Sequence, residues 1–336
     1  MSEVEFAGAA GVAFLVALAL VPALVRFAIG RDLLDVPNAR SSHEVPTPRL
    51  GGLAVIAGVW AAAPLMEGGG FVLVAATCAG LVGMLDDVID LRFWMKAVGQ
   101  AAVAFVLLFL LPPPISGATG PLWPLALLFG ALWIVAVVNA YNFMDGIDGI
   151  AGGTAILNAL FLTALVGDSY VDGFGAGLAA LAAAAAGFLM WNVSPARIFL
   201  GDSGSHFVGF FLGAVALYTE PVGETMAGTY LAFVVAAAVF APFLFDTAYT
   251  LVRRAWARKN VFTAHREHIY QRITPNPAKH RQVSIVYFGL SALSGLAALL
   301  AAGGTPLRLL SGGILVSGCC LFMAFLPRIA KERDRH

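Results

Sequence analysis

The sequence predicts an all-α, polytopic transmembrane bundle that forms one integral membrane domain over residues 1–336. Hydrophobic residues make up 60% of the chain. Charged residues make up only 12%, which is about half of what a soluble domain carries. Apolar runs long enough to cross the ~30 Å hydrocarbon core recur from one end of the sequence to the other. These three observations indicate a protein that is embedded in lipid.

Turn-forming segments such as EGGG and PPPISGATGP separate the apolar runs. We predict eleven spans, with ten as the alternative count. The first run follows Glu3 and Glu5 instead of basic residues, so we expect a spanning helix there and no cleaved signal peptide. The predicted spans are 6–28, 50–66, 71–85, 97–112, 121–138, 150–167, 174–191, 205–219, 227–252, 282–302 and 305–326.

The basic residues predict the orientation of these spans. If the N-terminus lies outside and the spans alternate, 19 of the 20 Lys and Arg residues fall on the inner side, and only Arg308 falls outside. This bias follows the positive-inside rule and places the C-terminus in the cytoplasm. The predicted cytoplasmic segments are 29–49, 86–96, 139–149, 192–204 and 253–281, with a tail at 327–336.

The polar motifs of the chain all fall in these cytoplasmic segments. They are LDDVID at 85–90, NAYNFMDGIDG at 139–149, IFLGDSGS at 198–205 and AHREHIYQRI at 264–273. A transporter or flippase, the alternative from another class, would need ionisable residues in its span centres. It would also tend to show a duplicated sequence, and this chain shows neither feature. The pattern therefore predicts an active site at the cytoplasmic membrane surface.

Three groups of carboxylates occur in these motifs. Crowded carboxylates at a membrane edge are costly unless a cation joins them. Oxygen ligands without Cys or clustered His favour Mg²⁺, with Mn²⁺ as the alternative. Mg²⁺ usually keeps coordination positions for phosphate oxygens, so we expect a phosphorylated substrate. The three groups are Asp86, Asp87 and Asp90, then Asp145 and Asp148, and finally Asp202.

Basic residues and glycines supply possible partners for that phosphate. Lys96, and His265, Arg266 and His268 in the last loop, are candidates to bind its charge. A helix that begins near Gly149 or Ser203 would direct its positive end at an anion. The glycines expected to allow tight turns and close approach of backbone N–H groups are Gly146, Gly149, Gly152, Gly153, Gly201 and Gly204.

Each motif also has an ordinary structural explanation. Gly and Asp at helix ends commonly serve as caps and turns, and most basic residues of 253–281 suit topology and lipid contact. His43 by itself is an ordinary loop histidine, and we expect Asp246 to pair with Arg253 or Arg254. Capping alone does not account for three acidic motifs on the same side of the membrane.

In their order, LDDVID, NAYNFMDGIDGIAGG, IFLGDSGS and the HREH loop resemble the polytopic polyprenyl-phosphate N-acetylhexosamine-1-phosphate transferases, as does PTPRLGG at 46–52. The resemblance covers essentially the whole chain. It implies that undecaprenyl phosphate attacks a UDP-N-acetylhexosamine, that UMP leaves, and that the protein lies in the bacterial inner membrane. The implied partners are these two substrates and the bilayer, with a second copy of the chain as a candidate and no nucleic acid.

The resemblance also implies roles for individual residues. It makes Asp202 and Asn142 the Mg²⁺ ligands and places Asp86 and Asp87 on the prenyl-phosphate side. It gives Lys96 a phosphate contact, stacks Phe199 on uracil and puts Asp148 near the polar edge of that base. His265, Arg266 and His268 would bind the diphosphate or the sugar. Asp145 joins the catalytic group and Asn139 the substrate-binding group.

The last loop departs from part of the family. HIYQ, with Tyr270 and Gln271, stands where related enzymes have H-I-H-H, and the three adjacent histidines of the peptidoglycan enzyme are absent. A UDP-muramyl-pentapeptide substrate is therefore the less favoured alternative. AHREHIYQRI resembles the subgroup that starts O-antigen or related glycans. The sugar remains open among N-acetylglucosamine, N-acetylfucosamine and N-acetylquinovosamine. An enzyme of prenyl-chain chemistry would repeat its DDxxD motif, whereas DDVID occurs once.

Overall fold

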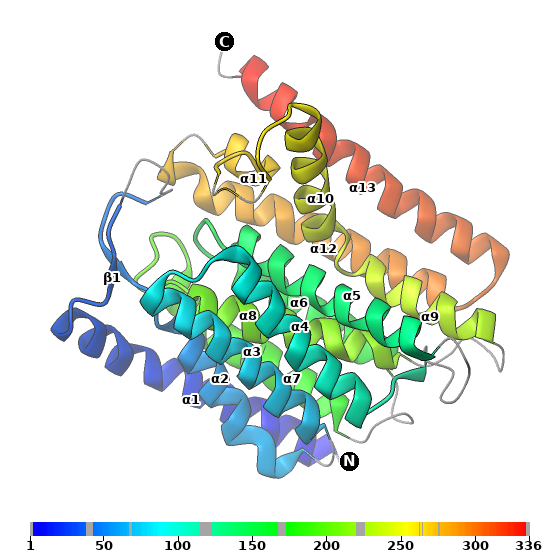
Figure 1. Ribbon diagram of the computed structural model, residues 1–336, viewed down its shortest axis with the longest axis horizontal. Coiled ribbons are helices and arrows are strands. Elements are labelled where there is room, and N and C mark those ends of the chain that lie inside the picture. The colour runs from blue at the N-terminus through cyan, green and yellow to red at the C-terminus, as the bar shows by residue number, and fades with distance from the viewer. Residues whose placement is uncertain are drawn as a thin grey trace.

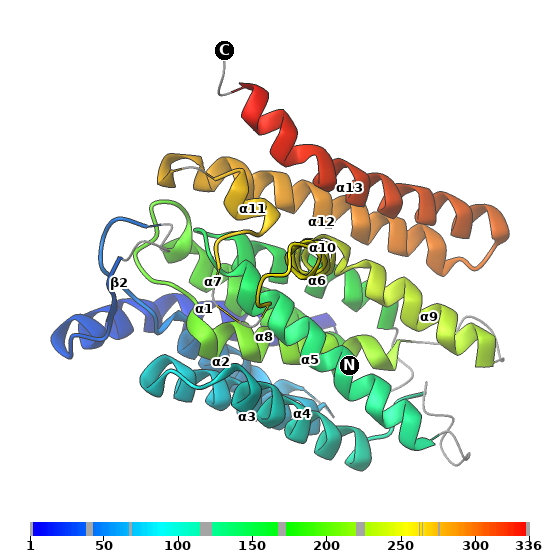
Figure 2. The same ribbon diagram turned by 45° about the horizontal axis from the view of Figure 1, so that its top comes forward.

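The computed structural model describes residues 3–37, 43–66, 69–114, 123–166, 173–219, 226–261, 263, 265–274 and 276–333. Its helices lie side by side in one bundle (Figures 1 and 2). In chain order they are α1 (Glu3–Gly30), α2 (Gly51–Ala62), α3 (Gly70–Ile89), α4 (Phe93–Leu110), α5 (Trp123–Met144), α6 (Ile150–Val166), α7 (Phe174–Asn192), α8 (Gly201–Val215), α9 (Met226–Ala238), α10 (Ala241–Trp256), α11 (Ile269–Arg272), α12 (His280–Ala302) and α13 (Pro306–Arg333).

Short elements complete the described part of the chain. The 3₁₀ turns are η1 (Ala63–Leu65), η3 (Ala216–Tyr218) and η4 (Pro277–Lys279). Strands β1 (Leu34–Asp35) and β2 (Thr47–Pro48) form a small antiparallel ribbon, in which Leu34 pairs with Pro48 and Asp35 with Thr47. The expectation of an all-α membrane bundle is confirmed, with this ribbon as the only β-structure among the described residues.

The helices support a multi-pass protein but leave the number of spans open. Among the described residues, seven helices are long and apolar enough to cross a membrane, or eight if one bent pair counts as a single span. Two shorter apolar helices, Gly51–Leu65 and Ile150–Val166, fall below that length. Each predicted apolar run coincides with a helix or a broken helix. The count of eleven spans stays a prediction.

The predicted span 227–252 is not one straight helix. It breaks between α9 and α10, which meet at 81°. Pro242 occupies the first turn of α10, where its fixed φ angle favours a new helix start and its missing N–H is tolerated. As a result α10 stands across the bundle in Figure 1 and is seen end-on in Figure 2.

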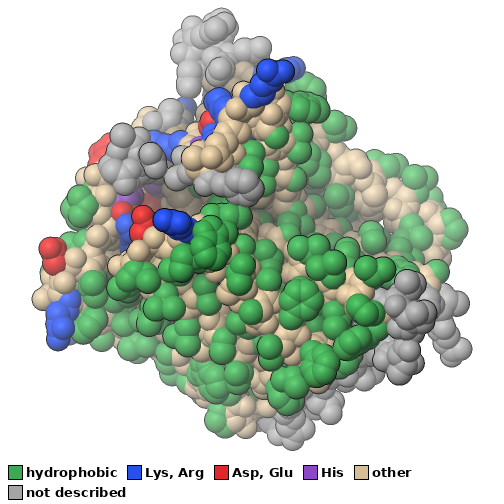
Figure 3. Space-filling model, in the orientation of Figure 1, with side chains coloured by type: hydrophobic (Ala, Val, Ile, Leu, Met, Phe, Trp, Pro, Cys, Tyr) green, Lys and Arg blue, Asp and Glu red, His purple; other side chains and the backbone are tan. Residues whose placement is uncertain are grey.

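Helix α8 lies in the interior of the bundle. Every residue of α8 except Asp202 is buried, so the only accessible side chain in this helix is at its first turn. The visible face of the molecule is covered by hydrophobic side chains, whereas the charged ones gather beside a recess at one end (Figure 3). This distribution suits a bundle surrounded by lipid with its polar chemistry at one end.

Several helices extend into the segments that carry the polar motifs. Asp86 and Asp87 lie in the last turn of α3, Lys96 in the first turn of α4, and Asn139 and Asn142 in the last turns of α5. Hydrogen-bonded helical backbone therefore positions these side chains, with only short connections between the helices.

Candidate active site

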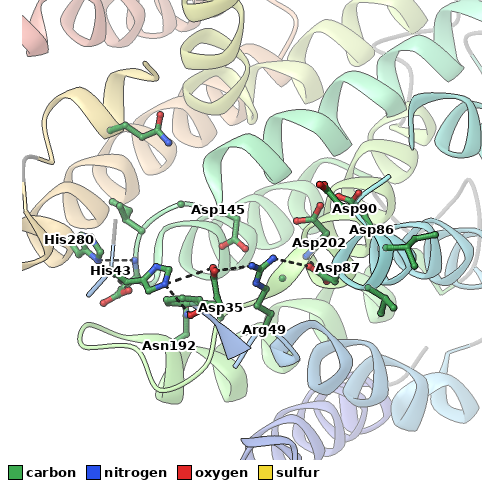
Figure 4. Close-up of a pocket in the computed structure, with 18 residues that line it drawn as sticks. Asp35, His43, Arg49, Asp86, Asp87, Asp90, Asp145, Asn192, Asp202 and His280 are labelled. Carbon is green, nitrogen blue, oxygen red and sulfur yellow. Dashed lines mark hydrogen bonds and ion pairs between the residues drawn. The ribbon is translucent and has the colours of Figure 1, made fainter. Parts of the chain in front are cut away.

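A cavity of about 860 Å³ opens at the polar end of the bundle (Figure 4). The motifs that are far apart in the sequence converge on it, as the sequence predicted for a single site. Its wall includes residues from the loop after α1, the end of α3, the α5–α6 connection, the end of α7, the start of α8, α11 and α12. Those that carry side-chain chemistry are Asp35, His43, Arg49, Asp86, Asp87, Asp90, Asp145, Asp148, Asn192, Phe199, Asp202, Gln271 and His280.

Backbone hydrogen bonds join the PTPRLGG segment to the segment before α8. Phe199 N donates to Pro48 O at 2.8 Å, and Gly51 N donates back to Phe199 O at 2.9 Å. Only glycine fits at position 52, because a Cβ atom there would lie 2.3 Å from the backbone of Gly204. The glycines of PTPRLGG and GDSGS therefore allow α2 and α8 to touch, which differs from the anion-binding role expected for Gly204.

The first turn of α8 is held by Asp87. Its Oδ2 accepts the backbone N–H groups of Asp202 at 3.1 Å and of Ser203 at 3.3 Å. A carboxylate at this position satisfies free N–H groups and interacts favourably with the helix dipole. Arg49 lies 3.9 Å from the other oxygen of Asp87 and 2.8 Å from Asp35. Asp87 thus positions Asp202. The N-terminus of α8, which we expected to face a substrate anion, binds the carboxylate of Asp87 instead.

Lys96 links the two acidic motifs. Its Nζ lies 2.6 Å from Asp86 Oδ2 and 3.8 Å from Asp202 Oδ2. The other oxygen of Asp86 accepts the backbone N–H of Leu91 at 2.7 Å, which fixes the carboxylate where α3 ends. Asp86, Lys96 and Asp202 therefore form one charged cluster, and the predicted contact of Lys96 with a substrate phosphate stays a prediction.

Asp145 lines the cavity beside this cluster, whereas Asn142 is not part of the cavity wall. Burial and the negative charges of Asp202 and Asp87 raise the pKa of Asp145 well above its usual range. Asn142 donates its amide N–H to Ser205 Oγ at 3.2 Å, which leaves its carbonyl oxygen as a possible ligand.

These carboxylate and amide oxygens form a donor set that suits Mg²⁺ or Mn²⁺. The described residues contain no group of three or more His, Cys, Asp or Glu side chains arranged to hold a metal. Mg²⁺ sites commonly use one or two protein carboxylates and complete their coordination with substrate phosphates, so the residues present fit such an ion.

The other end of the cavity carries aromatic and hydrogen-bonding groups (Figure 4). His43 packs edge-on against Phe199 with 4.9 Å between the ring centroids. Asp148 lies 3.2 Å from His280 Nδ1. Burial favours a higher pKa for Asp148, but the hydrogen bond and charge of His280 outweigh it and hold that pKa below its usual value. Asn192 is fixed between Gly149 N and Ile198 O.

The HREH loop is anchored to α10. Asp246 is fully buried and accepts hydrogen bonds from His268 Nδ1 and from the backbone N–H groups of Ile269 and Tyr270. The expected pairing of Asp246 with Arg253 or Arg254 is wrong. Both arginines bind Glu267 instead, because the loop folds back over the basic end of α10.

The predicted substrate residues of this loop precede α11. His265 stacks on His268 with 5.0 Å between centroids. Burial, together with the charges of His268 and Arg254, lowers the pKa of His265 to about 4. His265, Arg266 and His268 are not part of the cavity wall, where Gln271 represents this segment. Whether they contact substrate stays a prediction.

Asn139 points into the interior between helices. Its Nδ2 donates to Gln100 Oε1 at 2.8 Å, and Gln100 approaches His206 at 3.4 Å. Asn139 is not part of the cavity wall, and its predicted contact with substrate is untested.

Comparison with known proteins supports the resemblance. The profile of glycosyl transferase family 4 matches residues 70–220. A decaprenyl-phosphate N-acetylglucosaminephosphotransferase of Mycobacterium tuberculosis is 30% identical over 332 residues, covering 87% of this chain and 82% of the relative. An undecaprenyl-phosphate alpha-N-acetylglucosaminyl 1-phosphate transferase of Thermotoga maritima is 28% identical over 256 residues, covering 75% and 78%. The chain belongs to glycosyl transferase family 4, the polyprenyl-phosphate N-acetylhexosamine-1-phosphate transferases.

A relative named for a different sugar also matches. The phospho-N-acetylmuramoyl-pentapeptide-transferase of Heliobacterium modesticaldum is 32% identical over 241 residues, covering 64% of this chain and 74% of the relative. Membership of family 4 therefore does not by itself determine which sugar nucleotide the chain uses.

Arg49, His43 and His280 are among the residues of this family 4 site that were not assigned from the sequence. Arg49 lies within PTPRLGG, so that motif was a usable signal for it. His43 was expected to be an ordinary loop histidine, yet it lines the cavity against Phe199. His280 lies in no recognisable motif and begins α12, and only the packing of α12 against the α5–α6 connection brings it to Asp148.

Proposed function

We propose that the chain transfers an N-acetylhexosamine-1-phosphate from a UDP-sugar to a polyprenyl phosphate. A phosphate oxygen of the lipid forms a bond to the sugar-bearing phosphorus. The bond from that phosphorus to the bridging oxygen breaks, and UMP leaves with the bonding electron pair. The product is a lipid-linked sugar diphosphate. In this proposal the acceptor is undecaprenyl phosphate, and the product forms at the inner surface of a bacterial cytoplasmic membrane.

One observation carries the proposal. Asp86, Asp202 and Lys96 form a single charged cluster, and its two carboxylates line a cavity whose other end carries Phe199 and His280. A diphosphate with its cation suits the charged end, and a nucleoside suits the aromatic end. The family membership and the names of the two N-acetylglucosamine relatives point to the same reaction.

The side chains act mainly by positioning. The second pKa of a phosphate monoester is about 6, so the acceptor lipid is mostly a dianion at neutral pH and gains little from a strong base. Asp86 therefore orients Lys96, whose ammonium group offsets phosphate charge. Asp202 and Asn142 would hold Mg²⁺. When bound, the ion neutralises charge on the diphosphate and favours departure of UMP.

The sugar and the pathway are the finer part of the proposal. The HIYQ sequence and the relatives named for N-acetylglucosamine favour N-acetylglucosamine or a 6-deoxy relative, at the first step of O-antigen or a related envelope glycan. The Heliobacterium relative keeps UDP-N-acetylmuramoyl-pentapeptide as the second candidate donor.

The test is release of UMP from membranes that contain the protein. Undecaprenyl phosphate is supplied with a panel of UDP-N-acetylhexosamines and with UDP-N-acetylmuramoyl-pentapeptide, in Mg²⁺ or in EDTA. We expect one UDP-N-acetylhexosamine of the panel to give UMP and a lipid-linked sugar. We expect no product in EDTA and none from membranes that contain Asp202→Asn. Lipid movement without UMP release would indicate a flippase, and product from the pentapeptide donor alone would favour the second candidate.

A further inference from the structure

Arg49 lies in the middle of the cavity wall. Figure 4 shows its guanidinium group between Asp35 and Asp87, with a dashed line to each. The carboxylates of the charged end lie beyond Asp87, whereas His43 and Asn192 lie beyond Asp35. The side chain of Arg49 is 44% exposed, and it lines the cavity. Its guanidinium group is therefore accessible to a ligand that lies between the two ends of the cavity.

The backbone around Arg49 is fixed on both sides. Pro48 O accepts the backbone N–H of Phe199 at 2.8 Å, and Gly51 N donates to Phe199 O at 2.9 Å. The carbonyl group of Arg49 itself packs against Gly201, where an added Cβ atom would lie 2.2 Å from the carbonyl oxygen. These contacts hold the backbone of Arg49 between the segment that carries Phe199 and the first residue of α8.

Asp35 orients the guanidinium group. It lies in β1 opposite Thr47 of β2, which precedes Arg49 by two residues. Residues two apart in an extended strand point to the same side, so Asp35 and Arg49 are diagonal neighbours. Arg49 Nη2 donates to Asp35 Oδ1 at 2.8 Å, whereas Asp87 Oδ1 is 3.9 Å away, too far for a hydrogen bond. A guanidinium group has five N–H donors, so most of them are left for a ligand.

The charges of the cavity wall favour an anion at this cation. Seven aspartates line the wall, and among its described residues Arg49 is the only Lys or Arg. Ionised carboxylates repel a diphosphate unless cations offset their charge. Mg²⁺ held at Asp202 would offset part of it. A guanidinium group suits the remainder, because its planar N–H donors bind phosphate oxygens in pairs.

The place of Arg49 indicates which phosphate it reaches. In the proposed reaction the lipid phosphate attacks the sugar-bearing phosphorus, which therefore lies near Asp86 and Asp202. The other phosphate, which leaves in UMP, lies toward the nucleoside. Arg49 lies between those two carboxylates and His43 of the aromatic end, where this second phosphate belongs (Figure 4). When the bond from the sugar-bearing phosphorus to the bridging oxygen breaks, the electron pair stays on UMP, and a guanidinium group there offsets the new charge.

We propose that Arg49, held by Asp35, binds the nucleoside-side phosphate of the UDP-sugar and stabilises it as it leaves in UMP. The inference rests on the proposed function, because it names the side chain that serves the leaving group of that reaction. Asp35 is then a positioning residue. The structural alternative is an arginine that only joins the β1–β2 ribbon to α3 through Asp35 and Asp87.

The test measures binding of UMP and of uridine to the purified full-length protein in Mg²⁺ by titration calorimetry. Uridine lacks the phosphate, so its affinity reports whether the rest of the cavity is intact. We expect Arg49→Gln to bind UMP about tenfold or more weakly than the wild-type protein, the size of effect that a hydrogen bond to a charged group gives, and to bind uridine equally well. Arg49→Lys keeps the charge without the planar fork, and we expect it to recover part of the loss.

Arg197→Gln is the matched control. Arg197 is exposed, and its guanidinium group lies over the ring of Trp191, outside the cavity wall. Removal of this positive charge should leave both affinities and UMP release unchanged. In Arg49→Gln, by contrast, UMP release should fall even at saturating donor, because the leaving group has lost its cation.

The outcomes are distinct. An unchanged ratio of UMP to uridine affinity in Arg49→Gln, whether both affinities hold or both weaken equally, would overturn the role of Arg49 and favour the structural alternative. The proposed reaction would survive that result as long as the wild-type protein releases UMP. If the wild-type protein releases no UMP from any donor, the proposed function fails, and this inference fails with it. Should Arg49→Gln fold poorly, Arg49→Lys decides, since a wild-type ratio there would also overturn the role.

Discussion

Asp87 accepts the backbone N–H of Asp202 at 3.1 Å across 115 residues of sequence. This contact joins the last turn of α3 to the first turn of α8 and sets where the carboxylate of Asp202 lies. Asp87 is therefore best explained as a positioning residue, whereas its neighbour Asp86 contacts Lys96.

Replacing Asp87 should affect stability as well as activity. Asp87→Ala leaves the N–H groups of Asp202 and Ser203 without an acceptor, and we expect a loss of about 1–3 kcal/mol in stability. Asp87→Asn retains an accepting oxygen and should lose less. Thermal unfolding in detergent, measured beside UMP release, checks this order. Equal midpoints for Asp87→Ala and the wild-type protein would contradict it.

Asp202 and Asp86 should differ in how much activity depends on them. Asp202→Asn removes the charge expected to hold Mg²⁺, so we predict almost no turnover. Asp86→Asn disturbs the orientation of Lys96 but leaves its charge, so we predict a measurable residue of activity. A radiolabelled lipid-transfer assay compares the two variants at matched protein levels. Equal loss in both would show that this ranking is wrong.

Gly52 should not tolerate a side chain. Its added Cβ would lie 2.3 Å from the Cα of Gly204, and backbone on both sides leaves no flexible atom to move. We expect Gly52→Ala to lower the unfolding midpoint clearly and to reduce UMP release, because α2 and α8 would separate.

Gly289→Ala is the matched control for Gly52→Ala. This glycine is exposed on α12 and has nothing within 4 Å of the added atom. The change should leave activity unchanged and stability equal or slightly higher, since Ala favours a helix over Gly by up to about 1 kcal/mol. Similar losses in the two variants would argue against the α2–α8 contact.

The stability of the HREH loop should depend on pH through His265. Burial and the charges of His268 and Arg254 lower the pKa of His265 to about 4, below the ordinary histidine value. The unfolded chain then binds more protons between that value and about pH 6.5, so this contribution to stability falls as pH falls through the window.

His265→Gln removes the titrating group and is the test of this pH effect. We expect the wild-type unfolding midpoint to drop more than that of His265→Gln between about pH 7 and about pH 5. The two curves should converge near neutral pH if the glutamine fits. Parallel curves across the whole range would show that His265 titrates normally.

The sequence by itself determined the membrane class, the segments that carry the chemistry and the family. These features depend on hydrophobic run length, charge distribution and local motifs, all of which are contiguous in the chain. Asp86 and Asp202 could be named because each lies within such a motif, and Lys96 because it follows LDDVID in the same predicted cytoplasmic segment.

The tertiary structure decided which of these side chains meet and what each one contacts. Asp87 bonds the first turn of α8, a role that its neighbour Asp86 does not share. Asp246 bonds His268 instead of the arginines, and Asn139 donates to Gln100. The tertiary structure also brought His280 to Asp148. Such contacts join helices that are far apart in sequence, and they depend on close packing between helix backbones, which no local pattern of residues encodes.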